Sequence, residues 1–208
     1  MKKLITIIGM GAMLCMVPAC KKSDIKPQEL STTTADAKQS PQSDPQTQDA
    51  SLYVMLASKG CSTPQKDYTS VIVDIKSVKV YNAENVWVEL PVVSGTWDLV
   101  RMQQGDIPGL NITDRKNVKA GAISKVAITF GDNNKLVLNN KPVSCFKLGA
   151  QEVIMNIRGE VMAGRVNELL MSINICDNMS TQVNKDGTTC YILKPDMQFQ
   201  RITQKMIK

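Results

Sequence analysis

The sequence predicts an all-β fold, a β-sandwich of about nine strands formed by residues 51–208. Three observations support this prediction. Apolar and polar residues alternate in many short runs, turn-forming residues separate the runs, and helical periodicity is almost absent. Many short strands at regular spacing are typical of two packed sheets. No internal repeat is visible, so we expect one domain.

The longest alternating run, residues 69–82, is predicted to form one strand interrupted by a β-bulge. Val71, Val73 and Ile75 share one face of the run, and Val78 and Val80 continue the pattern on the opposite parity. A change of phase by one residue moves every later side chain to the other face, which is what a bulge produces. We therefore expect a bulge near Lys76–Ser77 rather than two separate strands.

The remaining strands are shorter alternating runs that follow one another along the chain. They are residues 51–57, 86–90, 123–130, 135–138, 152–160, 166–175, 189–195 and 197–203. Residues 131–134 (GDNN) have the composition of a hairpin turn, and Asn139-Asn140 forms a second turn of that kind. Residues 101–121 alternate poorly, so we expect a long loop there with room for a short helix.

Residues 1–19 have the features of a lipoprotein signal peptide. Lys2 and Lys3 form a basic start, and the apolar stretch that follows is shorter than the roughly 20 residues that span a bilayer as a helix. The sequence VPAC at 17–20 is similar to the bacterial lipobox, whose cysteine is acylated, with palmitate among the acyl groups, and becomes the new N-terminus. We predict lipidation at Cys20; plain secretion with a chance cysteine is the alternative.

An acylated Cys20 predicts a membrane partner reached through a lipid anchor. Each buried CH₂ of an acyl chain contributes about 0.8 kcal/mol, so several chains hold a protein at a bilayer without a spanning segment. Lys21 follows the cysteine where an inner-membrane lipoprotein of enteric bacteria has Asp. This favours the outer membrane, on either its periplasmic or its cell-surface face.

Residues 20–50 are predicted to be the lipidated N-terminus and a disordered tether. From residue 21 onward this segment contains Ser, Thr, Gln, Asp and Pro but no aromatic residue. Such a composition buries too little apolar surface to offset the entropy of ordering. We expect the tether to hold the folded domain away from the lipid surface.

Four cysteines remain in the expected mature domain: Cys61, Cys145, Cys176 and Cys190. An even number in an exported domain is consistent with two disulfides, and three connectivities are then open. Cys176 and Cys190 lie on consecutive predicted strands, which favours that pair and leaves Cys61 with Cys145. Buried free thiols are the alternative. We expect no metal site, because there is no C-x-x-C motif and no histidine.

The absence of histidine also excludes Ser-His-Asp and Cys-His nucleophile systems. No glycine-rich phosphate loop is present, so we assign no catalytic residue and no cofactor. Asp74 and Asp98 lie in or next to strand-like runs, where an aspartate more often belongs to a solvated face. A pair of such carboxylates that hydrolyses glycosides is the alternative.

The charge pattern excludes a nucleic-acid partner. The residues from Ser51 onward contain 19 basic and 14 acidic side chains, but the lysines are scattered and aromatic residues make up only 4% of the chain. A nucleic-acid surface needs a basic stripe with stacking rings. Trp87 and Trp97 are the candidates for stacking on a sugar ring, and anchoring the sandwich core is the alternative for both.

Residues 71–91 (VIVDIKSVKVYNAENVWVELP), followed by Trp97-Asp98-Leu99, resemble a domain of unknown function found in lipoproteins of Bacteroides-like bacteria. Its members share a V-x-V-D-I-x-x-V-x-V … W-x-x-L block, a later L-P-A-G block and a closing L-K-P. Residues 118–121 (VKAG) occupy the second place, and residues 193–195 (LKP) occupy the third. The late acidic D-F-D of the family is replaced by Ser172-Ile173-Asn174. The resemblance implies an immunoglobulin-like or transthyretin-like sandwich in the cell envelope, with no assigned activity.

These observations together predict a non-enzymatic envelope lipoprotein. Its β-sandwich would bind or scaffold a partner, and a carbohydrate or an envelope protein fits best. The alternative is a carboxylate-dependent envelope hydrolase that acts on glycan or peptidoglycan. A hydrolase needs two acids that converge in a cleft, whereas a binding module needs an exposed aromatic or apolar surface.

Overall fold

A computed structural model describes residues 49–59, 68–93, 95–103 and 109–206. All of these residues lie in one compact unit, Ser43–Lys208. The predicted signal peptide and nearly all of the predicted tether, including Cys20, lie outside the described residues. Among the described residues, none of the helices has the length and apolar character needed to cross a membrane.

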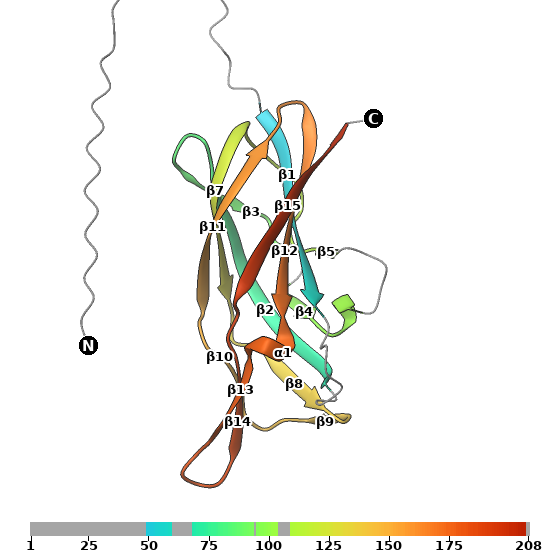
Figure 1. Ribbon diagram of the computed structural model, residues 1–208, viewed down its shortest axis with the longest axis vertical. Helices are drawn as coiled ribbons and strands as arrows, with labels where there is room; N and C mark the ends of the chain where they lie inside the picture. The colour runs from blue at the N-terminus through green and yellow to red at the C-terminus, as the bar shows by residue number, and fades with distance from the viewer. Residues whose placement is uncertain (1–48, 60–67, 94, 104–108, 207–208) are drawn as a thin grey trace, which may run out of the picture. The chain divides into compact units, whose positions relative to one another are not determined.

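The described chain is an all-β sandwich, as the sequence predicts, but many of its strands are short (Figure 1). The strands are β1 (Asp49–Lys59), β2 (Tyr68–Tyr81), β3 (Trp87–Leu90), β4 (Thr96–Asp98), β5 (Leu110–Asn111), β6 (Lys116–Lys119), β7 (Gly121–Phe130), β8 (Lys135–Leu138), β9 (Lys141–Pro142), β10 (Phe146–Leu148), β11 (Glu152–Val161), β12 (Arg165–Asn174), β13 (Met179–Val183), β14 (Thr189–Leu193) and β15 (Met197–Met206). A 3₁₀ turn, η1 (Arg101–Gln103), and one helical turn, α1 (Ile175–Asn178), complete the described elements.

One sheet has the order β15-β12-β1-β5, and β6 also pairs with β1. Strands β1 and β12 run parallel, so that Tyr53 faces Glu168 and Val54 faces Leu169. The other strand pairs of this sheet are antiparallel. Strand β15 therefore ends the sheet on one side and the short strands β5 and β6 end it on the other.

The second sheet has the order β11-β7-β2-β8-β9, and β3 and β4 pair with β2. The register between β2 and β7 shifts between Ile75 and Ser77, which confirms the predicted bulge. The bulge divides β2 into two halves with different neighbours. Residues 75–81 pair with β7 and β3, whereas residues 68–74 pair with β8 and β4.

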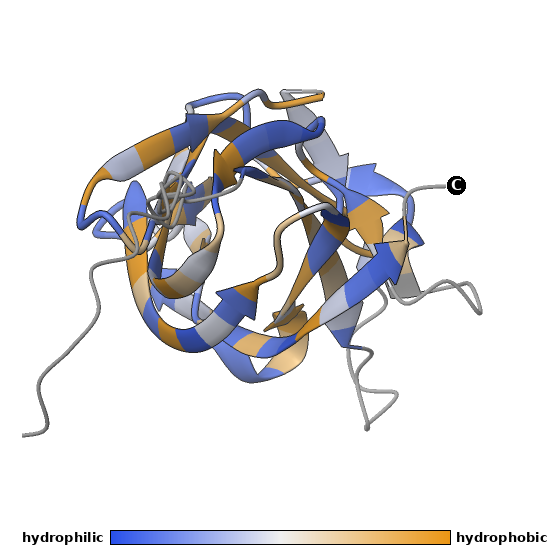
Figure 2. Cartoon of the chain, turned by 90° about the horizontal axis from the view of Figure 1, so that it is seen from above, coloured by the Kyte–Doolittle hydropathy of each residue, from blue (hydrophilic) through white to orange (hydrophobic). Residues whose placement is uncertain are grey.

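The hydrophobic core lies between these two sheets. Leu52, Val54 and Leu56 of β1 contribute to it from one sheet, and Val73 and Ile128 contribute from the other. Hydrophobic and hydrophilic residues alternate along the strands (Figure 2). This alternation, which predicted the fold class, has its cause in the pleat, because successive side chains point to opposite faces of the sheet.

Residues 131–134 do not join a hairpin, so this prediction is wrong. Strand β7 pairs with β2 and β11, and β8 pairs with β2 and β9, so β7 and β8 are not partners. The loop instead carries the chain from one half of β2 to the other. The second predicted turn is confirmed: Asn139 and Asn140 connect β8 to β9 with φ of 48° and 62°, as a type I′ hairpin turn requires.

The sequence also missed several short elements. Residues 101–121 are not one long loop, since they contain η1, β5 and β6, and both strands pair with β1. Helix α1 begins after Asn174, whose side chain accepts hydrogen bonds from the amides of Cys176 and Asp177. Strand β13 pairs with β14, and β14 pairs in parallel with β10 to give a separate three-stranded sheet. Figure 1 shows β13 and β14 as a hairpin at the lower end of the sandwich.

Candidate functional site

The outer surface of the second sheet carries a row of four side chains from four neighbouring strands. Trp87 of β3 faces Tyr81 of β2, Tyr81 faces Lys125 of β7, and Lys125 faces Asn156 of β11. Their neighbours in sequence, Val80 and Val126 among them, point into the core. We call these four residues the Trp87 row. With strands about 4.8 Å apart, the row extends over roughly 14 Å.

The aromatic pair at the end of this row is ordered by its neighbours and open to solvent. The rings of Tyr81 and Trp87 meet edge to face with centroids 5.2 Å apart. On the other side of Tyr81, Nζ of Lys125 lies 5.4 Å from the ring centroid, within cation–π range. Trp87 is 41% exposed. An indole held in place and left open in this way can stack on a flat ligand.

Trp97 lies elsewhere, so the structure does not bring the two tryptophans together. It faces Val73 on the other half of β2, eight residues from Tyr81, or about 26 Å along the strand. Trp97 is half-buried and packs against the core. Trp97 therefore helps to anchor the sandwich core, which was the alternative to sugar stacking, whereas Trp87 does not.

A cavity of about 360 Å³, which we call the Arg101 cavity, lies beside Trp97. Its walls come from β2 and β4, and from Arg101 of η1 and Leu110 of β5. Asp98 and Arg101 line it as well, with Nε of Arg101 3.6 Å from Oδ2 of Asp98. The cavity thus combines apolar side chains with one carboxylate and one guanidinium, which is the kind of lining that ligand sites have.

The carboxylate of Asp98 accepts three hydrogen bonds and forms one ion pair. Oδ1 accepts from the backbone amides of Val71, at 3.2 Å, and Val100, at 3.0 Å. Oδ2 accepts from the hydroxyl of Ser70 at 2.8 Å and also faces Arg101. A carboxylate accepts about four hydrogen bonds. Asp98 therefore ties β2 to β4 and pairs with Arg101, and three of its acceptor positions are already occupied by groups of the protein.

Asp74 is buried, so the expectation that it belongs to a solvated face is wrong. Its side chain is 1% exposed and forms an ion pair of 3.1 Å with Lys76. Both the amide and the side-chain nitrogen of Asn133 donate to its Oδ2. Burial alone would raise the pKa of Asp74, but these partners outweigh it and leave the pKa below its ordinary value. Asp74 thus ties the 131–134 loop to β2 beside the bulge.

A buried polar cluster on the first sheet was not found from the sequence. The hydroxyl of Tyr53 donates to Glu168 at 2.5 Å, and Nζ of Lys205 donates to the same carboxylate at 2.7 Å. Burial would raise the pKa of Glu168, yet the hydrogen bonds from Lys205 and Tyr53 lower it. Burial first, and then Glu168, raise the pKa of Tyr53. Tyr53 and Glu168 are 115 residues apart in the sequence, and a single sequence carries no signal that pairs residues so far apart.

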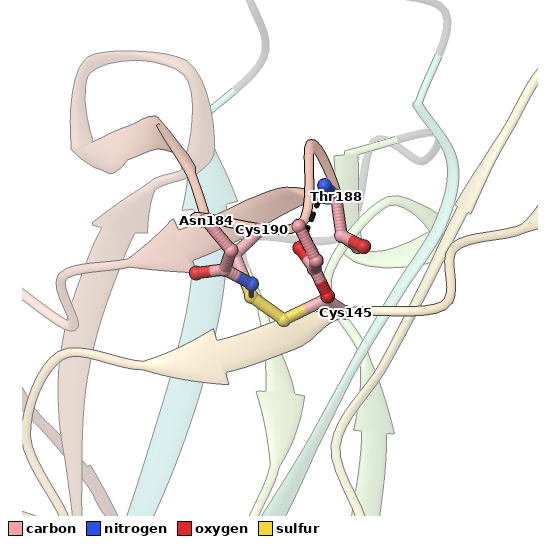
Figure 3. Close-up of a disulfide and its surroundings, with 5 residues drawn as sticks. Cys145, Asn184, Thr188 and Cys190 are labelled. Atoms are coloured by element: carbon pink, nitrogen blue, oxygen red, sulfur yellow. Dashed lines mark hydrogen bonds between the residues drawn. A yellow bond between two sulfur atoms is a disulfide. The ribbon is translucent and has the colours of Figure 1, made fainter.

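The structure contains a disulfide between Cys145 and Cys190 (Figure 3), so the pairing expected from the sequence is wrong. Phe146 and Tyr191 face each other in the parallel pair of β10 and β14, which places the preceding cysteines side by side with Cα atoms 4.6 Å apart. Gln182, not Cys176, faces Cys190 across the β13–β14 hairpin. Cys176 belongs to α1, before β13, and is disulfide-bonded itself. Cys61 lies outside the described residues.

The side chain of Asn184 lies against this disulfide from the hairpin turn (Figure 3). Its Nδ2 is 3.8 Å from Sγ of Cys190, and its backbone amide donates to the carbonyl of Thr188 at 2.9 Å. The disulfide therefore fastens the β13–β14 hairpin to β10. We see a structural role for it, because Cys190 is only 2% exposed.

Comparison with known proteins places the chain by family alone. No curated protein and no solved structure matches it. A family model described as a domain of unknown function matches residues 50–195, which include the Trp87 row, the Arg101 cavity and the disulfide. The chain therefore belongs to the DUF4382 family of domains of unknown function.

Proposed function

We propose that the protein is a lipid-anchored, non-enzymatic carbohydrate-binding module of the bacterial envelope, with the Trp87 row as its binding face. The observation that carries the proposal is the exposed Trp87 ring, fixed against Tyr81 on the outer surface of a sheet. Anchoring through Cys20 and an outer-membrane location belong to the same proposal and rest on the lipobox-like sequence at 17–20.

The mixed chemistry of the Trp87 row favours a sugar over a purely apolar partner. A sugar ring has a C–H face that packs on an aromatic ring, and hydroxyls at its rim that need hydrogen-bond partners. Lys125 and Asn156 supply such partners in the same row as the rings. Ile154, one row away and 56% exposed, widens the apolar area on this surface.

The hydrolase alternative finds less support in the geometry. A glycosidase needs two carboxyl groups about 5 to 9.5 Å apart that can exchange protons or attack the sugar. Among the described residues that line the cavity, Asp98 is the one carboxylate, and it already accepts from the amides of Val71 and Val100 and from Ser70. Asp74 is buried against Lys76. We therefore assign binding, not hydrolysis, to this domain.

The test is binding of the full chain, in mild detergent, to purified peptidoglycan sacculi and to insoluble cellulose. Trp87→Ala should weaken binding to one of these polymers by about 2 kcal/mol, roughly 30-fold, as for a central aromatic contact. Val183→Ala removes an apolar side chain that is even more exposed, 68% against 41% for Trp87, from the β13–β14 hairpin and should leave binding unchanged.

Three results would contradict the proposal. Retention by neither polymer, together with Trp87-dependent capture of an envelope protein, would make the partner a protein. Equal binding by Trp87→Ala and the unmodified chain would move the site away from the Trp87 row. Release of soluble sugars on incubation, lost in Asp98→Asn, would favour the hydrolase.

A further inference from the structure

We propose that the cavity beside Trp97 is a second site, which binds a carboxylate-bearing sugar through Arg101. The inference rests on the proposed function only in taking a sugar as the ligand, since the cavity is separate from the Trp87 row. Its volume of about 360 Å³ is at the small end of the range for ligand pockets and suits a single sugar unit of a longer chain.

The hydrogen bonds around Asp98 decide which polar groups remain for a ligand. The carboxylate accepts hydrogen bonds from two backbone amides and from the hydroxyl of Ser70, and it forms an ion pair of 3.6 Å with Nε of Arg101. This ion pair is longer than a hydrogen bond, and a guanidinium has five N–H donors in a fixed fork. The terminal nitrogens of Arg101 therefore remain as donors at the cavity, with a side chain that is 84% exposed.

Donors without acceptors favour a ligand that is an anion. A planar carboxylate matches the guanidinium fork and can accept two parallel hydrogen bonds from it. The local charge also favours an anionic ligand. Ile72 of β2 faces Asp98 on one neighbouring strand and Lys135 on the other, so Lys135 lies in the same cross-strand row. The negative charge of Asp98 is offset by Arg101, so Lys135 leaves this surface net positive.

The other walls of the cavity favour a sugar as the body of the ligand. Ile72 and Leu110, the latter 38% exposed, give the cavity an apolar surface on which the C–H face of a sugar ring can pack. Ser70 and Thr96 place hydroxyl groups at the same cavity. A uronic acid unit, with one carboxylate, several hydroxyls and one apolar face, has the groups that these side chains can satisfy.

The experiment is calorimetric titration of the full chain with α-1,4-tetragalacturonate and with α-1,4-tetragalactose, in which an uncharged CH₂OH group replaces each carboxylate. Tetragalacturonate should bind at least tenfold more tightly than tetragalactose. Arg101→Ala should remove this preference, and Arg101→Lys should restore only part of it, because an ammonium keeps the charge without the fork. Arg158→Ala, a change at an exposed arginine of β11, is the matched control and should bind as the unmodified chain does.

The results separate this site from the Trp87 row. Trp87→Ala should leave tetragalacturonate binding unchanged, and Arg101→Ala should leave retention on the insoluble polymers unchanged. Equal affinity for the two tetramers, or full tetragalacturonate binding by Arg101→Ala, would overturn the inference. Inorganic sulfate that competes as well as galacturonate would overturn the assignment of a carboxylate. Because Arg101 is mostly exposed, its replacement should not unfold the domain.

Discussion

Tyr53 and Glu168 face each other across the parallel pair of β1 and β12, and the Tyr53 hydroxyl donates a 2.5 Å hydrogen bond to the Glu168 carboxylate. Lys205 of β15 donates to the same carboxylate, so one buried acid links three strands of the first sheet. The cluster lies beside a small apolar group that includes Met55 and Leu170, away from the main core. A buried charge with two donors is stabilising only while both donors are present.

Removal of either partner in this cluster should therefore destabilise the domain. Tyr53→Phe should lower the free energy of unfolding by about 1 to 2 kcal/mol, and Glu168→Ala by about 2 to 3 kcal/mol, because the remaining polar group loses its partner. Urea denaturation of each variant measures the change. Glu160→Ala, at an exposed glutamate of β11, is the control, and equal midpoints for all four proteins would contradict the prediction.

Stability should fall in acid because of Glu168 and Asp74. The pKa of each lies below its ordinary value, 4.5 for Glu168 and 3.8 for Asp74. The folded state therefore holds their protons less tightly than the unfolded chain does. Their stabilisation is complete above the ordinary values and is lost as the pH falls through the lowered ones. Urea midpoints between pH 7 and pH 3 should show this loss, and Glu168→Gln should show a smaller one.

The Cys145–Cys190 disulfide should contribute substantially to stability. It closes a loop with a sequence separation of 45, for which the chain-entropy model gives about 4 kcal/mol. Replacement of both cysteines by serine should lower the free energy of unfolding by an amount of that order. A digest of the unreduced protein should yield the peptide that joins Cys145 to Cys190. A peptide that joins Cys176 to Cys190 would contradict the structure.

A side chain at Gly131 should destabilise the domain, because a Cβ there would collide with the carboxylate of Asp74 and the side chain of Lys76. Gly131→Ala should cost about 1 to 3 kcal/mol, the usual range for overpacking. Gly149→Ala is the matched control, since its Cβ would make only ordinary contacts, the nearest at 3.5 Å. Thermal unfolding of the two variants compares them directly. A Gly131→Ala protein as stable as Gly149→Ala would refute the close packing of Gly131 against Asp74.

Cys20→Ala should release the protein from the membrane fraction, if Cys20 is acylated as proposed. Acyl chains provide the only membrane attachment that the proposal contains, so their loss should move the chain to the soluble fraction. Fractionation followed by immunoblotting measures the distribution, and Cys15→Ala is the matched control. Unchanged partitioning of Cys20→Ala would refute lipidation at this residue.

The sequence predicted those features that depend on local alternation. The fold class, the bulge between Ile75 and Ser77 and the Asn139–Asn140 turn all follow from the period of two and from turn chemistry. The wrong predictions concern partners distant in sequence. Two strands next to a turn-like loop suggested a hairpin, but β7 and β8 each pair with a different half of β2.

For the candidate sites, too, the sequence indicated single residues but not the partners that surround them. Trp87 and Trp97 were identifiable as residues, since aromatic side chains are few in this chain. Their surroundings were not, because the Trp87 row is assembled by cross-strand register and the Arg101 cavity by side-chain hydrogen bonds to Asp98. The disulfide shows the same limit, because Cys145 and Cys190 meet through a parallel strand pair that no local pattern indicates.

The extra residue in β2 decides how the two proposed sites are oriented. Tyr81 belongs to the Trp87 row and Ile72 lines the Arg101 cavity, and the two residues have opposite parity along one strand. In an uninterrupted strand they would point in opposite directions, whereas the bulge at Lys76 turns both outward. The two sites thus open on the same side of β2, about 30 Å apart along the strand. Deletion of Lys76 would turn one site into the interior while the other stayed outside.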